Sequence, residues 1–357
     1  MTPSRYTVIG LMSGTSGDGL DLALCEFEKS ESWKFQILEA ETVTFPFLLE
    51  SDLMNSHILS ALELSLLDVS FGRWMGEMVN AFCKRYNCQP DAVCSHGHTV
   101  YHQPNKGLSL QIGNGWALHQ STGMKVINDF RMLDVQLGGQ GAPLVPIGDK
   151  LLFPEMNFCI NLGGIANISM EWNGSRIAFD TCPFNLLLNK QAKLLGAKYD
   201  DQGKWASEGT IDRILLEKLN LIPFYKKNSV KSLGREDLEK DFMPLISDSE
   251  ASPKNILATL VAHFAIQIGR VIRDYSNQPI PKVLLTGGGA YHTFFVQSLE
   301  KQLHGSINIA GQTPRLIEFK EALIFSFLGV LRLRGDMNCL RSVTGATEDS
   351  SGGMIFG

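Results

Sequence analysis

The sequence lacks the excess of basic residues that marks most nucleic-acid-binding proteins. Its 32 lysines and arginines are outnumbered by 37 aspartates and glutamates, giving a formal net charge of −5. Nucleic acids and anionic membrane surfaces are bound through basic patches, so neither is expected as a partner. A charged content of 19% beside a hydrophobic content of 44% is typical of a folded globular protein.

Long hydrophobic runs are also missing. The longest apolar candidate, residues 322–331, is well short of the ~18 residues that a membrane-spanning helix needs. A shorter apolar stretch, residues 8–12, leads directly into a glycine-rich segment and lacks the length of a signal-peptide core. We therefore expect a cytoplasmic protein that makes no membrane contact.

Cysteines are few, and their spacing is not that of a zinc site. The total of seven is odd and fits a reducing compartment. Zinc sites pair ligands two to four residues apart, whereas the densest group has the pattern C-x4-C-x5-C-x-H-x-H. This group consists of Cys83, Cys88, Cys94, His96 and His98. Buried thiols without a metal are the favoured interpretation.

Two common nucleotide-binding motifs are absent. The chain contains no G-x-x-x-x-G-K-[ST] motif and no G-x-G-x-x-G motif after a strand. A nucleotide would have to be held by other glycine-rich turns, with its base beside the last of them. Three such turns are present, at residues 14–19, at Gly163-Gly164 and at Gly287-Gly288-Gly289.

The first turn, SGTSGDGLD at residues 13–21, is much longer than a two-residue hairpin turn. Its glycines allow successive N–H groups to point inward as an anion nest, and its hydroxyl groups add donors. Its carboxylates would repel bare phosphate but suit Mg²⁺ or a sugar hydroxyl. A mobile loop is the alternative. The candidate phosphate-binding residues are Gly14, Thr15, Ser16, Gly17, Asp18, Gly19, Leu20 and Asp21.

Alternation of strand and helix patterns predicts an α/β protein. Each half of the chain opens with a strand, a glycine-rich turn and a second strand, which suggests two related modules. These paired strands are expected at 6–12 and 20–27, and again at 158–161 and 165–172. Further strands are expected at 35–45, 92–94, 108–113, 125–130, 177–180 and 281–286, and helices at 65–86, 184–196, 255–276 and from 292.

The length of 357 residues exceeds one ordinary hydrophobic core and predicts two domains. Residues 135–148 contain four glycines and two prolines, and we place the boundary there, giving domains 1–135 and 136–357. The polar segment 223–245 is expected to be a solvated loop or helix face.

A carboxylate follows the apolar residues 177–179. Asp180 would be partly desolvated near the N-terminus of the next helix, which suits a general base in phosphoryl transfer. The alternative is that Asp180 or Thr181 only caps that helix. His96 and His98 follow another strand and are expected to line a cleft.

Eleven short motifs follow one another along the whole chain. They are IGLMSGTSGDGLDLAL (9–24), CSHGHTVYHQP (94–104), LQIGN (110–114), NDFRMLD (128–134), GGQGAPLVP (138–146), NLGGIANIS (161–169), AFDTCPFN (178–185), KSLGRE (231–236), LLTGGGAYH (284–292), KEALIFSFLG (320–329) and SVTGA (342–346). In this order they resemble the motifs of the anhydro-N-acetylmuramic acid kinase family. The resemblance implies an actin-like ATPase and sugar kinase architecture: two RNase-H-like domains with mixed sheets flanked by helices, a central cleft and a homodimer.

The family resemblance implies a reaction of cell-wall recycling. ATP with Mg²⁺ phosphorylates O6 of 1,6-anhydro-N-acetylmuramic acid while water opens the anhydro bond, giving N-acetylmuramate 6-phosphate. Residues 14–21 match the ATP phosphate loop, with Asp18 as a candidate metal ligand, and Asp180 matches the base toward the attacking water. Arg131 matches an arginine that can meet the lactyl carboxylate of the sugar. Glu321 matches an acidic residue at the mouth of the sugar site.

The chain departs from the family pattern at four positions. Gly17 stands where the family commonly has leucine, His98 stands for glutamine, and Cys182 and Phe184 stand for glycines. Phe184 is expected to add bulk where a bare backbone could approach the sugar. The departures at His98, Cys182 and Phe184 make a kinase of a related amino sugar one alternative, and a non-catalytic ATP-binding sensor is another.

Overall fold

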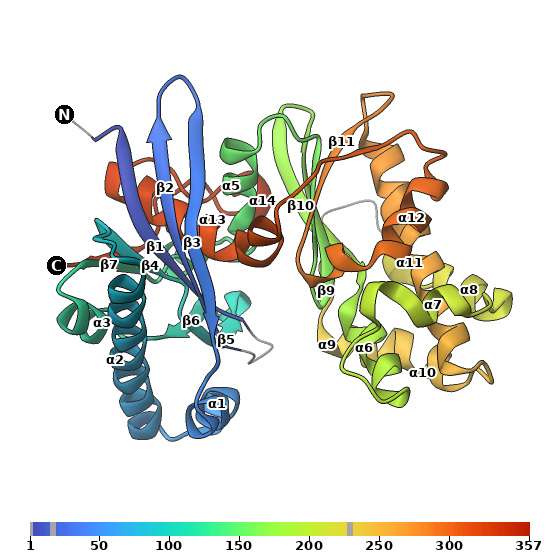
Figure 1. Ribbon diagram of the computed structural model, residues 1–357, viewed down its shortest axis with the longest axis horizontal. Helices are drawn as coiled ribbons and strands as arrows, with labels where there is room; N and C mark the ends of the chain where they lie inside the picture. Colours follow the sequence, from blue (N-terminus) through green and yellow to red (C-terminus); the bar gives the residue numbers. More distant parts are fainter. Residues whose placement is uncertain (1–2, 15–18, 227–230) are drawn as a thin grey trace. The chain divides into compact units, whose positions relative to one another are not determined.

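The computed structural model describes residues 3–14, 19–226 and 231–357 (Figure 1). The chain forms two compact units. The first unit comprises Met1–Phe153 and Phe319–Gly357, and the second comprises Pro154–Glu318. The chain therefore leaves the first unit once and returns to it.

This division differs from the boundary predicted at residues 135–148. Helix α5 (Val145–Leu152) belongs to the first unit, because its Gly148 lies against Ile324 with space for a hydrogen only. A Cβ atom there would be 2.3 Å from that isoleucine side chain. Asp149 of the same helix forms a buried ion pair of 2.7 Å with Lys320, on the returning segment. The two units given above therefore replace the predicted domain limits of 1–135 and 136–357.

A six-stranded mixed sheet forms the first unit, with the order β13-β7-β4-β1-β2-β3. Strands β1, β4 and β7 run parallel, so their carboxyl ends meet at one edge of the sheet. The expected strand pair around the first glycine turn is confirmed as an antiparallel pair of β1 and β2. The strands are β1 (Arg5–Ser13), β2 (Leu20–Lys29), β3 (Trp33–Val43), β4 (Ala92–Ser95), β7 (Lys125–Asn128) and β13 (Met354–Phe356), and β5 (His98–Gln103) and β6 (Leu108–Ile112) form a separate pair.

The longest helix of the first unit, α2, begins at a capping box. The Ser60 hydroxyl accepts from the Glu63 amide, and the Glu63 carboxylate accepts from the Ser60 amide. Phe71, Met75 and Val79 repeat at helical spacing and join the core cluster of the sheet. The helices are α1 (Phe47–Met54), α2 (Ala61–Tyr86), α3 (Gly115–Thr122), α4 (Met132–Gln136), α5, α13 (Pro314–Arg334, shared with the second unit) and α14 (Arg341–Thr344), with single turns η1 (Ser56–Ile58) and η2 (Pro104–Lys106).

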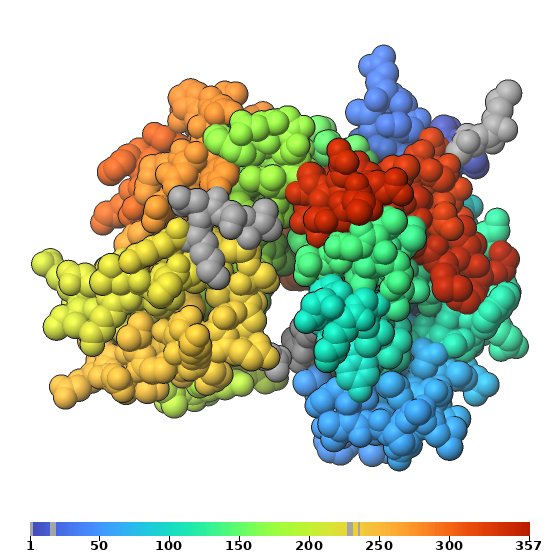
Figure 2. All heavy atoms as spheres, turned by 180° about the vertical axis from the view of Figure 1, so that it is seen from behind, coloured from blue at the N-terminus to red at the C-terminus, as the bar shows by residue number. Residues whose placement is uncertain are grey.

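The returning C-terminal segment is fastened to the first unit by a buried aspartate. Asp134 accepts hydrogen bonds from the Thr344 hydroxyl at 2.7 Å and from the Gly141 amide at 2.7 Å. The Cys339 thiol donates to the same carboxylate at 3.1 Å. In the view from behind, the red C-terminal atoms lie against green atoms of the first unit (Figure 2).

The second unit is built on a five-stranded sheet with the order β10-β9-β8-β11-β12. Strands β8 and β11 run parallel, and β9 and β10 continue the sheet in antiparallel fashion. The predicted strand, turn and strand at the start of this half are confirmed. The strands are β8 (Phe158–Leu162), β9 (Ile165–Trp172), β10 (Ser175–Pro183), β11 (Lys282–Thr286) and β12 (Asn308–Ile309).

Helix α11 (Pro253–Tyr275) packs on one face of this sheet (Figure 1). Its length and hydropathy would suffice to cross a membrane, yet 72% of its most apolar window is buried, as in the core helix of a folded domain. The other helices are α6 (Asn185–Leu194), α7 (Lys204–Glu208), α8 (Arg213–Asn220), α9 (Arg235–Asp237), α10 (Met243–Ser247) and α12 (Thr293–Gln302), with shorter turns η3 (Asp201–Gly203), η4 (Pro223–Lys226), η5 (Leu238–Phe242) and η6 (Gly288–Tyr291).

Residues 223–245 are not the solvated segment that was expected. The described part forms short helical turns whose apolar side chains enter the core of the second unit. Tyr225 is 5% exposed, and its hydroxyl lies 2.8 Å from Nε2 of the buried His263. The prediction of a solvated segment was wrong because it gave weight to the charged residues that lie between these buried apolar residues.

The side chains of Cys182 and Phe184 also lie in this core, and the expectation of added bulk at the sugar is wrong. Phe184 is 0% exposed and packs against Phe264 and Phe295, with ring centroids 5.1 and 4.8 Å away. Cys182 is 0% exposed in the same cluster. The side chains that replace the two family glycines are therefore packed inside the core of the second unit.

Replacing Phe184 by alanine is expected to destabilise the protein by about 3–5 kcal/mol, because a fully buried ring leaves a cavity. Urea unfolding measures this change. Leu194→Ala, at the end of the helix that Phe184 precedes and 69% exposed, is the control and should stay within about 0.5 kcal/mol. A Phe184→Ala variant of near wild-type stability would contradict the core assignment.

Candidate active site

The carboxyl edge of the sheet in the first unit gathers the polar residues predicted there. Ser13 ends β1, His96 follows β4, and Arg131 follows β7 by a few residues. Because these three strands are parallel neighbours, segments distant in sequence meet at one edge.

His96 and Arg131 form a direct pair. The Nε2 atom of His96 accepts from Nε and Nη2 of Arg131 at 3.2 and 2.9 Å. Its Nδ1 lies 2.8 Å from the Gly97 carbonyl, which places the ring proton on Nδ1 by inference from the hydrogen-bond network. Burial, aided by the guanidinium, holds the pKa of His96 well below its usual value. His96 is therefore a neutral acceptor that orients Arg131.

Arg131 keeps its charge in this surrounding. Burial lowers its pKa to about 10, and the carboxylate of Glu321 opposes that shift. Burial raises the pKa of Glu321, opposed chiefly by Arg131. Nη1 of Arg131 donates to the Gly141 carbonyl at 2.8 Å, so the guanidinium is fixed by two loops. The structure thus brings the predicted pair Arg131 and Glu321 into one electrostatic neighbourhood.

His98 contacts the start of the glycine-rich turn. Its Nδ1 lies 3.2 Å from the Ser13 hydroxyl, and the ring is 5% exposed. The central residues of the predicted phosphate loop, Thr15, Ser16, Gly17 and Asp18, lie outside the described residues.

The flanks of the predicted phosphate loop are well defined. Gly14 follows β1, and Leu20 and Asp21 begin β2. Gly19 lies so close to β3 that a Cβ atom would be 2.6 Å from the Val43 carbonyl oxygen. The Asp21 carboxylate accepts from the Thr42 hydroxyl at 2.6 Å. These contacts fix the point where the loop rejoins the sheet.

Sequence reasoning missed Asp129 at the same edge. Its backbone φ is +55°, an uncommon value for a residue with a side chain, and burial raises the pKa of its carboxyl. Its position directly after β7 was a signal that could have found it, since Arg131, two residues later, was already assigned to the site.

In the second unit, a polar row crosses the sheet on the face opposite to the hydrophobic core. Asp180 on β10 pairs with Asn167 on β9, Asn167 pairs with Asn161 on β8, and Asn161 pairs with Thr286 on β11. Directly paired residues project on the same face of a sheet. Their sequence neighbours, such as Ile168, belong to the core cluster on the other face.

Asp180 lies within β10, not at its end, and neither it nor Thr181 caps the next helix. The N-cap of α6 is Phe184, with no side-chain cap. The Asp180 carboxylate instead accepts from the Leu233 amide at 2.8 Å and from the Ser232 hydroxyl at 3.1 Å. Burial raises its pKa, and these two donors oppose the shift. A partly buried carboxylate with such donors can accept a proton from a nearby hydroxyl group or water.

The two glycine turns of the second unit follow parallel neighbouring strands. Gly163-Gly164 follows β8, and its carbonyl groups accept from the first amides of α6, including that of Phe184 at 2.8 Å. Gly287 follows β11 with a φ of +78°, and a Cβ atom there would be 2.4 Å from the Asn161 amide oxygen. Both turns thus lie at one edge, beside the polar row.

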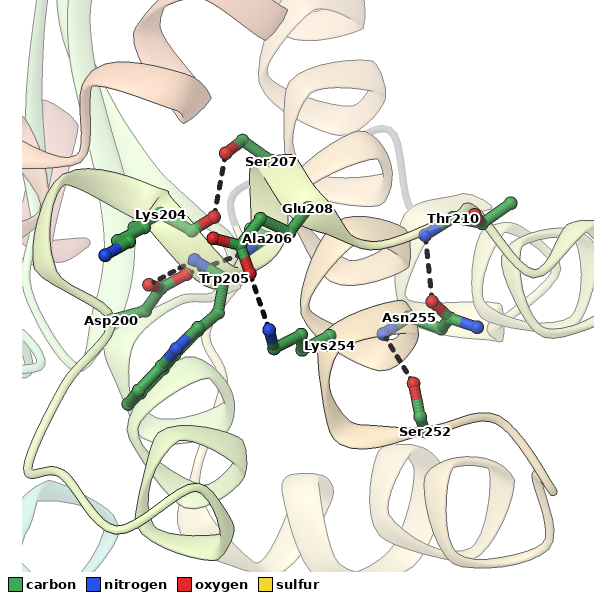
Figure 3. Close-up of polar contacts among 10 residues, drawn as sticks. All are labelled: Asp200, Lys204, Trp205, Ala206, Ser207, Glu208, Thr210, Ser252, Lys254 and Asn255. Carbon is green, nitrogen blue, oxygen red and sulfur yellow. Dashed lines mark hydrogen bonds and ion pairs between the residues drawn. The ribbon is translucent and has the colours of Figure 1, made fainter.

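A cavity of about 610 Å³ adjoins the glycine turn after β11. Its walls come from Gly288, Gly289 and following residues, from the first turns of α6 and from the loop 199–202. The Asp200 carboxylate holds that loop by accepting from the Trp205 and Ala206 amides at 2.8 and 2.9 Å (Figure 3). No sequence motif pointed to the loop 199–202, because it becomes part of the cavity wall only when the chain is folded.

Across residues 3–14, 19–226 and 231–357, no three His, Cys, Asp or Glu side chains are grouped so that they could hold a metal ion. All seven cysteines are unpaired thiols. Asp18, the predicted metal ligand, lies outside these ranges.

Comparison with known proteins matches the chain to one family. The family model "Anhydro-N-acetylmuramic acid kinase" matches residues 6–357. The protein of that name from Picosynechococcus sp. is 34% identical, over 95% of this chain and 96% of its own. That from Haemophilus influenzae is 32% identical, over 100% and 98%. Among solved structures, the Acidaminococcus fermentans (R)-2-hydroxyglutaryl-CoA dehydratase component A overlaps with a TM-score of 0.48 at 12% identity, covering 92% of this chain and 99% of that one.

The cavity generates a test of the expected nucleotide position. A Cβ atom at Gly288 would have only the Asn185 amide within 4 Å, at 3.9 Å, so we expect a Gly288→Val variant to fold and its side chain to narrow the cavity. We expect ATP affinity, measured by calorimetry, to fall at least about tenfold, or ~1.4 kcal/mol.

Two other glycines serve as controls for this test. Gly289→Ala should lower the unfolding temperature, because its Cβ would be 2.6 Å from the Phe184 ring. Gly311→Val has open space and should change neither property. Unchanged ATP affinity in Gly288→Val would place the nucleotide elsewhere.

Proposed function

Because the chain belongs to the anhydro-N-acetylmuramic acid kinase family, we propose that it phosphorylates 1,6-anhydro-N-acetylmuramic acid at O6 with ATP. Water opens the anhydro bond in the same reaction, and the products are N-acetylmuramate 6-phosphate and ADP. We also propose that the enzyme works in the cytoplasm as a homodimer, as its family resemblance implies.

The observation that carries the proposal is the setting of Asp180. Its carboxylate is oriented by Ser232 and Leu233 on the polar face of the sheet. Burial raises its pKa toward the range of a useful general base. In the proposed reaction, Asp180 removes a proton from the water that attacks C1 of the sugar.

The nucleotide is assigned to the glycine turns. The adenosine lies in the cavity lined by Gly288 and Gly289, and the triphosphate extends toward Gly163-Gly164 and Gly287. Backbone N–H groups in such turns suit phosphate oxygens. Residues 14–21 are also assigned to phosphate binding in this proposal, and Ser13, which precedes them, is held by His98.

Mg²⁺ accompanies the triphosphate in this proposal. Magnesium is usually held by one or two carboxylates together with substrate phosphates, so a carboxylate in the phosphate loop suits it. Asp18 is the proposed protein ligand. When bound, the ion neutralises phosphate charge during transfer.

The sugar is assigned to residues of the first unit. Arg131 carries a charge and is held by His96, which suits bidentate binding of the lactyl carboxylate. Glu321 sets the local charge beside it. The buried Cys182 and Phe184 give no reason to expect a different sugar. Of the residues that motivated a related amino sugar, only His98 lies at the proposed site.

An Asp180→Asn variant is expected to lose turnover by about 10²–10⁴-fold, the usual contribution of a general base. ATP affinity should remain, because the nucleotide turns are untouched. Mass spectrometry of N-acetylmuramate 6-phosphate measures turnover, with Asp248→Asn, an exposed carboxylate away from the cavity, as the control. Full turnover of Asp180→Asn would remove Asp180 from the mechanism.

A Ser232→Ala variant is expected to move the acid limb of the pH–rate profile to higher pH. The Ser232 hydroxyl stabilises the charged carboxylate and lowers the pKa of Asp180, so its loss raises that pKa. The base is then deprotonated only at higher pH, by up to about one pH unit. Ser207→Ala, an exposed serine on α7, is the control. A shift to lower pH would contradict the assignment.

A further inference from the structure

We propose that Asn167 is a second catalytic residue, whose side-chain amide donates a hydrogen bond to O6 of the sugar as the C1–O6 bond breaks. The inference rests on the proposed function, in which Asp180 is the base toward water.

Asn167 lies directly opposite Asp180 in the antiparallel pair of β9 and β10. Side chains of directly paired residues share a face, with Cβ atoms about 4.5–5.5 Å apart. The neighbours Ala166 and Ile168 are 0% exposed in the core cluster, so they fix the register. A slip by one residue would bury the amide and expose both apolar side chains. Asn167 is therefore held beside the base.

The polar row places Asn167 between the base and the phosphate-binding turns. Asn161, the next member of the row, lies on β8 shortly before Gly163 and against Gly287. Neighbouring strands are about 4.8 Å apart, so β10 and β8 are separated by about 10 Å. The strand between them carries Asn167.

This spacing matches the path that the coupled reaction requires. Oxygen of water bonds to C1 and gives its proton to Asp180, while the electron pair of the C1–O6 bond passes to O6. O6 then bonds to the γ-phosphorus, and ADP leaves. A base-to-water contact of about 3 Å and two reacting approaches of about 3–3.5 Å span about 10 Å. O6 carries its developing negative charge near the middle of this path, opposite the central strand.

The side-chain amide of Asn167 is available for a hydrogen bond to O6. It is partly exposed and makes no hydrogen bond within the described parts of the chain. By contrast, the Asn185 amide donates to the Leu162 carbonyl at 3.1 Å, which fixes α6 to the sheet. An uncommitted neutral donor facing a developing oxyanion stabilises the transition state more than the ground state.

The test compares three variants at Asn167. Asn167→Ala should lower kcat by about 10²–10³-fold, as loss of one oxyanion donor does, with KM for ATP unchanged. Asn167→Asp keeps the volume but replaces the donor by a carboxylate, so its loss should be at least as large. Asn167→Ser keeps a donor and should recover part of the rate. Asn308→Ala, on the exposed edge strand β12, is the control and should retain wild-type kcat.

Failure of this inference is distinguishable from failure of the proposed function. Wild-type protein that gives no sugar phosphate would refute the function itself. An active wild type, an inactive Asp180→Asn variant and an Asn167→Ala variant with wild-type kcat would refute only the role of Asn167. A rise in KM for the sugar at unchanged kcat would likewise refute it, because that result reports ground-state binding. Thermal unfolding of the near-isosteric Asn167→Asp variant separates a chemical loss from misfolding.

Discussion

The two-residue alternation of the sheet in the second unit is the constraint on which the site depends. One face of this sheet is apolar and packs against α11, and the other carries the row from Asp180 to Thr286. A bulge at Thr181 interrupts the alternation, so Asp180 faces the polar side while Cys182, two residues later, enters the core. The bulge thus lets one strand hold the Asp180 carboxylate on the polar face and continue into the packed start of α6.

In the first unit, neighbouring groups hold the partly buried Arg131 in place while it keeps its charge. A neutral histidine, His96, accepts from Arg131, so the guanidinium is oriented without being neutralised. The carboxylate of Glu321 opposes the lowering of the Arg131 pKa that burial causes. The result is a fixed cation suited to a carboxylate ligand, on the sheet edge where three parallel strands end.

The sequence predicted those parts of the fold that depend on local pattern. Strands β8 and β9 and helix α11 were found because alternation and helical spacing extend over each whole element. Contacts between distant segments could not be found in this way. The residues that hold Asp180 lie 52 and 53 positions later, and the C-terminal segment returns to Asp134 across 210 positions. Phe184 was misplaced because a pattern gives the position of a side chain but not the face on which it packs.

The central claim is that water attacks C1 while the phosphoryl group goes to O6. Reaction of wild-type protein with Mg·ATP and 1,6-anhydro-N-acetylmuramic acid in ¹⁸O-water tests it, with fragment-resolved mass spectrometry of the sugar phosphate. Unlabelled N-acetylmuramate 6-phosphate incubated in the same water corrects for exchange at C1. The account predicts one ¹⁸O atom at C1 and none in the phosphoryl group. Label in the phosphoryl group, or product without label at C1, would contradict it.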